Sequence, residues 1–266
     1  MSVDSKQERQ DRMATLIFSR GTMRVEELQA EIGVSAMTLY RDLAELEARH
    51  VITRGRVEVS AAATSLSETS FEFRLGQEVA SKQALAGPAA AVVQRGDSVF
   101  VDDSSTAWFA MARMLAATET TIVTNCLGAV ERAMETGETD VIMVGGRLAP
   151  RLQAFYGPSA VASLRRLQVD VALLGAAAVR GGRIFHPYEE VADFKREVID
   201  RSGRSVLLVT ASKFSRTALY EVAPLREVDL IVTDLPLEDP QLQAALDAGV
   251  EVLGPSAQEG TQEQQG

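Results

Sequence analysis

Three adjacent hydroxyl residues, Ser104, Ser105 and Thr106, follow a short apolar run and precede an amphipathic segment with helical spacing. At such a junction, free backbone N–H groups and the positive end of the helix dipole attract anions, and hydroxyl groups add further donors. The arrangement predicts a phosphate site. The simpler alternative is that these residues only cap the helix, which is the commoner role of serine and threonine there.

Polar and glycine residues also follow the other predicted strands. Ligands of open α/β sheets bind outside the carboxyl ends of the strands, where glycine permits close backbone approach. Lys213 would supply the countercharge to a phosphate, whereas Asp102 and Asp103 would repel it unless they point away or bind sugar hydroxyls. The expected effector-binding residues are Asp102, Ser104, Ser105, Thr106, Thr124, Asn125, Gly145, Gly146, Gly175, Glu190, Lys195 and Lys213.

An alternation of strands and helices must position these residues. Short apolar runs alternate with amphipathic segments such as TAWFAMARMLA and SAVASLRRL. This pattern is typical of βαβ units, so we expect an α/β fold with a mostly parallel sheet covered on both faces. The predicted strands lie near 98–102, 120–124, 140–144, 170–175, 205–209 and 229–233.

The first 60 residues follow a different pattern. Apolar residues at helical spacing predict helices over 8–19 and 25–33, and Ser35 is a suitable N-cap for a third helix that extends to residue 50. The alternating run 51–60 around Gly55 predicts a β-hairpin. Two helices joined by a tight glycine turn and followed by a hairpin make a winged helix-turn-helix.

A helix-turn-helix places its third helix in the major groove of DNA. Arginine can pair with a guanine edge, and hydroxyl groups can contact bases or phosphate. The alternative is an ordinary three-helix subdomain with a solvated polar face. The expected DNA contacts are Ser35, Thr38, Tyr40 and Arg41 from the helix and Arg54 and Arg56 from the wing.

These patterns divide the chain into four parts. Residues 1–60 are the expected DNA-binding domain, and the small, polar run 61–70 is the expected linker. Residues 71–255 are the expected sensor and oligomerisation domain, and 256–266 have the composition of a disordered tail. We expect at least a dimer, because one helix-turn-helix reads too few base pairs for tight specificity.

Composition restricts the function classes. The net charge is −10, but residues 1–60 carry only −1 of it, so one basic face remains available for DNA. No apolar run approaches the roughly 20 residues that cross a bilayer, and the N-terminus has no apolar signal region. A single cysteine, Cys126, and two distant histidines, His50 and His186, argue against a metal site. We expect a cytoplasmic protein without cofactor.

The segment VEELQAEIGVSAMTLYRDLAELEARHVITR, residues 25–54, resembles the helix-turn-helix of the DeoR family of bacterial sugar-operon regulators. The matching positions are Val34, Ser35, Thr38, Leu39, Arg41, Asp42, Leu43, Leu46, Glu47 and Arg54. Tyr40 stands where the family usually has a second arginine, and RGRVEVS replaces its usual His-Gly-Gly in the wing.

Residues 71–253 resemble the sensor half of the same family. The matching segments, in the family's order, are VDDSSTAWFAMARML, TNC at 124–126, GGRL at 145–148, EEVADFKR at 189–196 and SKF at 212–214. Asp103 stands where the family prefers a small residue. The resemblance implies a fold similar to ribose-5-phosphate isomerases and glucosamine-phosphate deaminases. It also implies a DNA-binding regulator of a sugar-catabolism operon that responds to a phosphorylated sugar. Repression relieved by the sugar is the family expectation, and the sequence itself leaves the sign of regulation open.

Two other function classes compete with a regulator. A sugar-phosphate isomerase or deaminase needs a carboxylate beside the substrate carbonyl, and the related isomerases carry acids directly after the fourth strand. GAAAVRGG at 175–182 has none there, which leaves Glu189, Glu190 and Lys195. A DNA-binding scaffold protein without ligand response is the third class.

Overall fold

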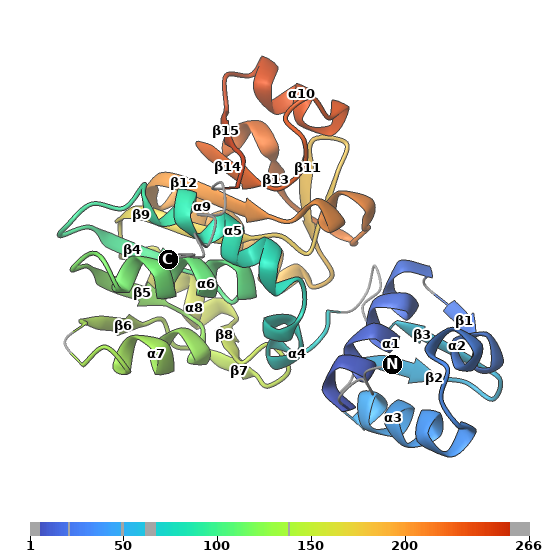
Figure 1. The fold of residues 1–266 in the computed structure, drawn as a ribbon. Helices are drawn as coiled ribbons and strands as arrows, with labels where there is room; N and C mark the ends of the chain where they lie inside the picture. The colour runs from blue at the N-terminus through green and yellow to red at the C-terminus, as the bar shows by residue number, and fades with distance from the viewer. Residues whose placement is uncertain (1–5, 21, 49–50, 62–67, 138, 256–266) are drawn as a thin grey trace, which may run out of the picture.

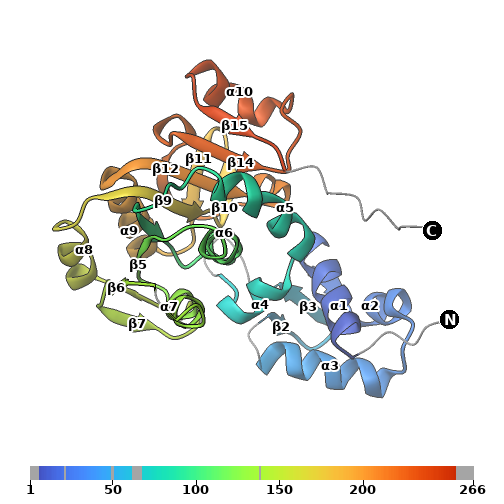
Figure 2. The ribbon, with the colours of Figure 1, turned by 60° about the vertical axis from the view of Figure 1, so that its left-hand side comes forward.

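The computed structural model describes residues 6–20, 22–48, 51–61, 68–137 and 139–255. Two parts lie side by side, a winged domain over 6–61 and a sensor domain over 68–255, with helix α4 (Phe71–Gly76) where they meet (Figures 1 and 2). His50, positions 62–67 of the predicted linker and the predicted tail 256–266 lie outside the described residues.

The winged domain has the predicted helix-turn-helix with one additional strand. Its helices are α1 (Lys6–Arg20), α2 (Val25–Ile32) and α3 (Ala36–Ala48). The wing strands β2 (Ile52–Arg54) and β3 (Glu58–Ala61) pair antiparallel, and β3 also pairs with β1 (Thr22–Arg24), which the sequence analysis did not predict. Gly33 ends α2 with φ at 75°, a left-handed conformation that favours glycine.

The sensor domain is built on seven parallel strands, which confirms the predicted α/β fold. Their spatial order is β15-β14-β12-β9-β4-β5-β6. The strands are β4 (Ser98–Val101), β5 (Thr121–Thr124), β6 (Val141–Met143), β9 (Val169–Gly175), β12 (Ser202–Val209), β14 (Leu230–Thr233) and β15 (Glu251–Leu253). Six of them were predicted; the seventh, β15, is a three-residue edge strand whose short apolar run carried little signal.

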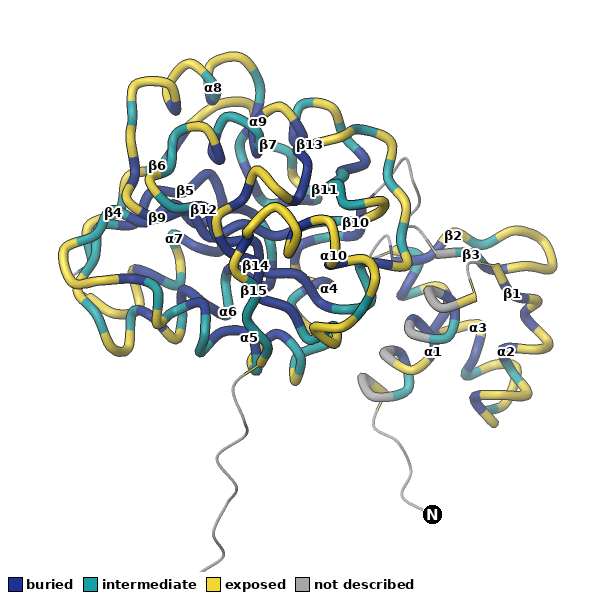
Figure 3. The backbone as a smooth tube through the Cα atoms, turned by 90° about the horizontal axis from the view of Figure 1, so that it is seen from above, coloured by how far each residue is buried: buried dark blue, intermediate teal, exposed yellow. Residues whose placement is uncertain are grey.

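Helices cover both faces of this sheet, because alternate residues of each central strand point to opposite faces. Val99 and Val101 of β4 belong to one buried cluster and Phe100 to the other. The helices α5 (Val79–Ala90), α6 (Ser105–Leu115) and α7 (Leu127–Met134) contribute to the first cluster, and α8 (Pro158–Leu164), α9 (Glu189–Asp200) and α10 (Pro240–Asp247) to the second. Figure 3 shows the central strands as the buried part of the tube.

Two small sheets and two turns complete the sensor domain. β10 (Ala178–Arg180), β11 (Arg183–His186) and β13 (Tyr220–Pro224) pair antiparallel, and β7 (Arg147–Ala149) pairs with β8 (Ala154–Tyr156). The 3-10 turns are η1 (Ala211–Ser215), directly after β12, and η2 (Leu225–Glu227). Of the helices described here, none is long and apolar enough to span a bilayer.

Candidate effector site and nucleic-acid interface

A buried ion-pair network ties the ends of β4 and β9 to helix α9. The carboxylate of Asp102 accepts hydrogen bonds from the backbone N–H groups of Ser104 and Gly175, both at 2.9 Å, and from the ammonium group of Lys195. Lys195 also lies 3.2 Å from Asp103. Both Asp102 and Lys195 are buried. Their charges therefore neutralise each other, and these two residues form the framework of the site.

The second acid, Asp103, is held by Arg74 of helix α4. The Arg74 guanidinium donates to the Asp103 carbonyl at 2.8 Å, lies 3.4 Å from its carboxylate, and donates to the Thr69 carbonyl at 2.9 Å. Burial alone raises the pKa of Asp103, but Lys195 and Arg74 outweigh it and lower that pKa below its ordinary value. Neutralisation by two cations explains how two acids can lie next to a candidate anion site.

The predicted hydroxyl segment lies at the start of α6. Ser104 caps this helix, since its hydroxyl accepts the N–H of Ala107 at 3.0 Å, while Ser105 and Thr106 are buried. A Cβ atom on Gly175 would lie 2.3 Å from the Cβ of Ser104, so glycine is required there for close packing. The cavity beside these residues, which we call the inner cavity, measures about 30 Å³. That volume holds one or two water molecules and no sugar.

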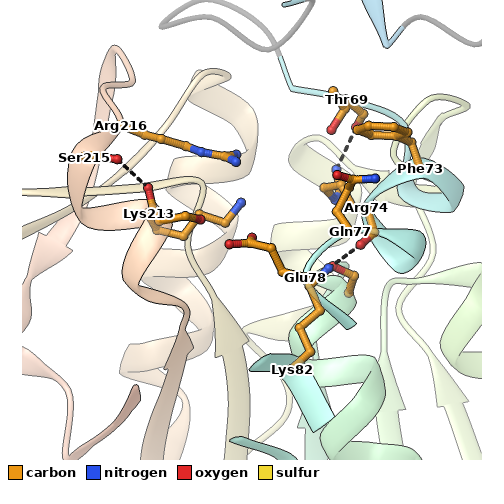
Figure 4. A pocket seen from close by; sticks show the side chains of 11 residues that line it. Thr69, Phe73, Arg74, Gln77, Glu78, Lys82, Lys213, Ser215 and Arg216 are labelled. Atoms are coloured by element: carbon orange, nitrogen blue, oxygen red, sulfur yellow. Dashed lines mark hydrogen bonds between the residues drawn. The ribbon is translucent and has the colours of Figure 1, made fainter. Parts of the chain in front are cut away.

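A larger pocket opens beside the inner cavity and shares Arg74, Ser105 and Lys213 with it. Its volume of about 420 Å³ lies in the range of small-molecule sites. In Figure 4, Lys213 and Arg216 from the η1 region face Arg74, Gln77 and Glu78 across it. The lining residues are Thr69, Phe73, Arg74, Gln77, Glu78, Lys82, Ser105, Ser212, Lys213, Ser215 and Arg216.

Positive charge is concentrated in this larger pocket. Burial, followed by repulsion from Arg216, lowers the pKa of Lys213 to about 8. Burial and repulsion from Lys213 lower the pKa of Lys82 to about 7, and its ammonium group donates to the Arg74 carbonyl. Because the cations repel one another, a bound anion would stabilise all of them.

Glu68 and His186 complete the wall of the inner cavity. Burial raises the pKa of Glu68, but Arg74 and Lys213 bring it down to about 2, so this acid is charged. Burial and the nearby Lys195 lower the pKa of His186 to about 4, so the imidazole is neutral. Its Nδ1 accepts the N–H of Tyr188 at 3.2 Å, which leaves the proton on Nε2 as a donor.

Six of the expected effector residues line neither cavity. The β7–β8 hairpin closes the ends of β5 and β6, since Phe155 N–H donates to the Asn125 carbonyl at 2.9 Å and Leu127 N–H to the Gln153 carbonyl at 2.8 Å. Thr124 donates to the Val101 carbonyl, Gly146 packs on the Tyr156 carbonyl, and Glu190 pairs with Arg147 on the surface. The six residues outside the cavities are Asp102, Thr124, Asn125, Gly145, Gly146 and Glu190.

The sequence analysis missed most of the cations in the larger pocket. Arg74 and Lys82 precede every strand-end motif, and Glu68 falls in the predicted linker. One signal was present: Lys82 is the single charged residue of helix α5, whose other residues are mostly small or apolar. A lone cation in such a helix is costly to bury without a partner, and that cost marks a functional position.

Helix α3 presents the predicted face. Leu39, Leu43 and Leu46 are buried, while Tyr40 and Arg41 are exposed. The hydroxyl of Ser35 accepts the N–H of Thr38 at 3.3 Å and lies 3.0 Å from the Thr38 hydroxyl, so Ser35 is the N-cap that the sequence predicted.

Two further features of helix α3 were not predicted. Met37 is 84% exposed at the start of α3, where its apolar side chain can contact a thymine methyl group. Asp42 of the motif is buried and bound by Arg9 at 2.6 Å, so it joins α3 to α1. In the wing, Arg54 lies 3.3 Å from Glu47, and Arg56 is exposed at the turn.

Known protein families match both parts of the chain, the winged domain and the sensor domain. Residues 9–60 match the DeoR-like helix-turn-helix domain, and residues 77–235 match the DeoR C terminal sensor domain. Among solved structures, ribose 5-phosphate isomerase A of Methanocaldococcus jannaschii aligns with 50% of this chain and 53% of its own, at 18% identity and a TM-score of 0.37.

Relatives with similar sequences extend over almost the whole chain. An uncharacterised helix-turn-helix transcriptional regulator of Bacillus subtilis is 31% identical, over 92% of this chain and 95% of its own. A putative aga operon transcriptional repressor of Escherichia coli O157:H7 is 29% identical, over 94% of each chain. The L-fucose operon activator of Haemophilus influenzae is 26% identical, over 84% of this chain and 90% of its own. The chain belongs to the DeoR family of transcription regulators.

Proposed function

We propose that this regulator controls a sugar-catabolism operon and that its effector is a phosphorylated sugar bound in the larger pocket. The observation that carries the proposal is the group of Lys82, Lys213 and Arg216 around a pocket of about 420 Å³, with Glu78 as the lining carboxylate. Together with Arg74 these cations outnumber the acid, and the excess of positive charge suits a phosphate monoester, which carries about 1.5 to 2 negative charges near neutral pH.

Polar side chains suit the rest of such a ligand. Thr69, Gln77, Ser212 and Ser215 line the same pocket and can bond to sugar hydroxyls. An isomerase would need a carboxylate free to move a proton. Burial raises the pKa of Glu78 in this pocket, but a hydrogen bond from Ser212 and the charges of Lys213 and Arg216 lower it, so this carboxylate is a weak base. Asp102 and Asp103 are engaged by Lys195 and Arg74, so the geometry supports binding of a sugar phosphate rather than its conversion.

Whether the effector weakens or strengthens DNA binding depends on which conformation of the protein, the DNA-binding one or the other, binds the effector more tightly. Relatives with both signs occur, since one is named a putative repressor and another an activator. We take repression relieved by the effector as the proposed sign. The protein would act in the cytoplasm as a dimer or tetramer, with paired α3 helices on double-stranded DNA half-sites. Sedimentation as a monomer with and without DNA would contradict the oligomer.

Replacing Arg41 by alanine tests the DNA-reading surface. If Arg41 reads a base edge, the change costs about 1–3 kcal/mol on the specific operator and relaxes sequence preference. Fluorescence anisotropy on the operator and on a scrambled duplex measures both effects. Arg56→Ala is the matched control, because a phosphate contact in the wing should weaken both duplexes alike. Equal losses on both duplexes for Arg41→Ala would show that Arg41 contacts only phosphate.

Effector binding should depend on pH. The lowered pKa values of Lys82 and Lys213, about 7 and about 8, leave part of their charge missing at pH 8, and a bound anion raises both values. Binding therefore takes up protons, and affinity falls between pH 7 and 9 by up to about tenfold per pH unit for each proton taken up. Calorimetry with a panel of sugar phosphates, in buffers of different ionisation enthalpy, counts the protons. Binding without proton uptake would contradict this site.

A further inference from the structure

The short helix α4 joins the hydrophobic cores of the two domains. Phe71 is buried in the sensor core, where its ring lies so close to Gly128 that a Cβ there would sit 2.5 Å away. Phe73, two residues further on, is buried in the core of the winged domain together with Met13 and Ile17 of α1. In both Figure 1 and Figure 2, α4 lies where the domains meet. A shift of α4 relative to the sensor domain would therefore act directly on the winged core.

The same helix forms one wall of the larger pocket. Phe73 and Arg74 both line it, and Arg74 lines the inner cavity as well. Arg74 holds α4 in place through the Asp103 carbonyl at 2.8 Å and the Thr69 carbonyl at 2.9 Å, and Lys82 donates to the Arg74 carbonyl. The position of α4 therefore depends on what Arg74 and Lys82 bind.

A phosphate in the pocket would compete for these donors. It offers three strong acceptor oxygens, and the planar guanidinium of Arg74 is suited to bind two of them. The Arg74–Asp103 carboxylate contact is long, at 3.4 Å, so it is the contact most readily exchanged for a phosphate oxygen. Replacing a protein acceptor of Arg74 or Lys82 by a phosphate oxygen changes the hydrogen bonds that fix α4. Phe73 directly precedes Arg74 in this helix, so it would move with it.

We propose that α4 transmits the state of the effector pocket to the DNA-binding domain, with Arg74 as the sensing residue and Phe73 as the contact to the winged core. The proposal rests on the proposed function, in that the pocket takes a phosphate-bearing ligand. Arg74 is a positioning residue here: it acts on DNA binding through Phe73 and α1.

Hydrogen–deuterium exchange on the full chain tests this route without any ligand. Arg74→Lys keeps the charge but loses the fork of donors, and we expect it to change amide exchange in α1 by at least about tenfold. Ser215→Ala is the matched control, since Ser215 lines the same pocket from η1 and donates to the Ser212 carbonyl within that turn. Protection of β9 and β12 shows whether the sensor domain stays folded. Unchanged α1 exchange in a folded Arg74→Lys variant would overturn the proposal.

A second variant tests the other end of α4 and separates this proposal from the proposed function. Because Phe73 also lines the pocket, calorimetry first gives the affinity of Phe73→Leu for inorganic phosphate and sugar phosphates, and DNA binding is then measured at ligand concentrations that saturate the variant. Its DNA affinity should no longer respond to them, whereas the unaltered chain should respond by about 5–150-fold. An undiminished response in Phe73→Leu would overturn the role of α4. Absence of any phosphate binding in the unaltered chain would instead overturn the effector assignment, and the ligand-free exchange result would still decide the mechanical route.

Discussion

Replacing Lys195 by methionine is expected to destabilise the sensor domain by about 3–5 kcal/mol, since removing one partner leaves a buried charge uncompensated. Lys195 is the cation that contacts both Asp102 and Asp103, and all three side chains are at most 5% exposed. Methionine fills a similar volume, so the loss reports charge rather than packing. Urea unfolding followed by the fluorescence of the single tryptophan, Trp108 in α6, measures it within the sensor domain.

The pH dependence of this variant provides a second test. In the unaltered chain the pKa of Asp103 is lowered, so its contribution to stability is present above the ordinary pKa and is lost as the pH falls. Without Lys195 the pKa of Asp103 is lowered less, so the difference in stability between the variant and the unaltered chain should become smaller as the pH falls. Asp102→Asn in the Lys195→Met background should restore part of the loss. A Lys195→Met variant with unchanged stability and unchanged pH slope would contradict the framework role.

Replacing Lys213 by alanine is expected to weaken effector binding by about 2–3 kcal/mol, or 30–150-fold, because a hydrogen bond to a charged group contributes about that much. Lys213 lies in the larger pocket and in the inner cavity, and it has no part in the Asp102–Lys195 pair. DNA affinity without effector should stay unchanged, since α3 and the wing are formed by other residues.

Two measurements on this variant separate the outcomes. Calorimetry gives the affinity for the sugar phosphate, and anisotropy gives the affinity for the operator with and without it. Arg165→Ala serves as the control, since it removes an exposed cation that pairs with Glu197 and lines neither cavity. An unchanged effector response in Lys213→Ala would contradict the pocket assignment. Equal loss of both affinities would indicate a misfolded protein rather than an altered site.

Local pattern was enough to predict the helix-turn-helix and most of the sheet. Leu39, Leu43 and Leu46 repeat at helical spacing, and each central strand is a continuous apolar run that needs no long-range contact to be recognised. Strands β1 and β15 have only three residues each, and they are strands because β3 and β14 offer them hydrogen bonds. Pairing of this kind depends on the fold and leaves little trace in the sequence.

The pocket was harder to predict, because its charges come from segments that only the fold brings together. Ser105 and Lys213 were expected at strand ends, and both line the larger pocket. Arg74 and Lys82 reach it from helices that precede β4, the first strand of the sensor sheet, where no motif marks them. Spacing also cannot show that Lys195 is neutralised by Asp102, or that the β7–β8 hairpin covers Asn125. Those outcomes depend on side-chain packing and on which cation lies nearest to each acid.

The central claim is that a sugar phosphate in the pocket controls how tightly the chain binds specific DNA. Selection of bound fragments from the source genome, with and without a panel of sugar phosphates, tests it most directly. The account predicts enrichment of a few fragments with repeated half-sites, and loss of that enrichment with one sugar phosphate. Failure to enrich any fragment at low salt, where even weak phosphate contacts hold, would contradict the DNA-binding role. Enrichment that no sugar phosphate changes would contradict the effector role.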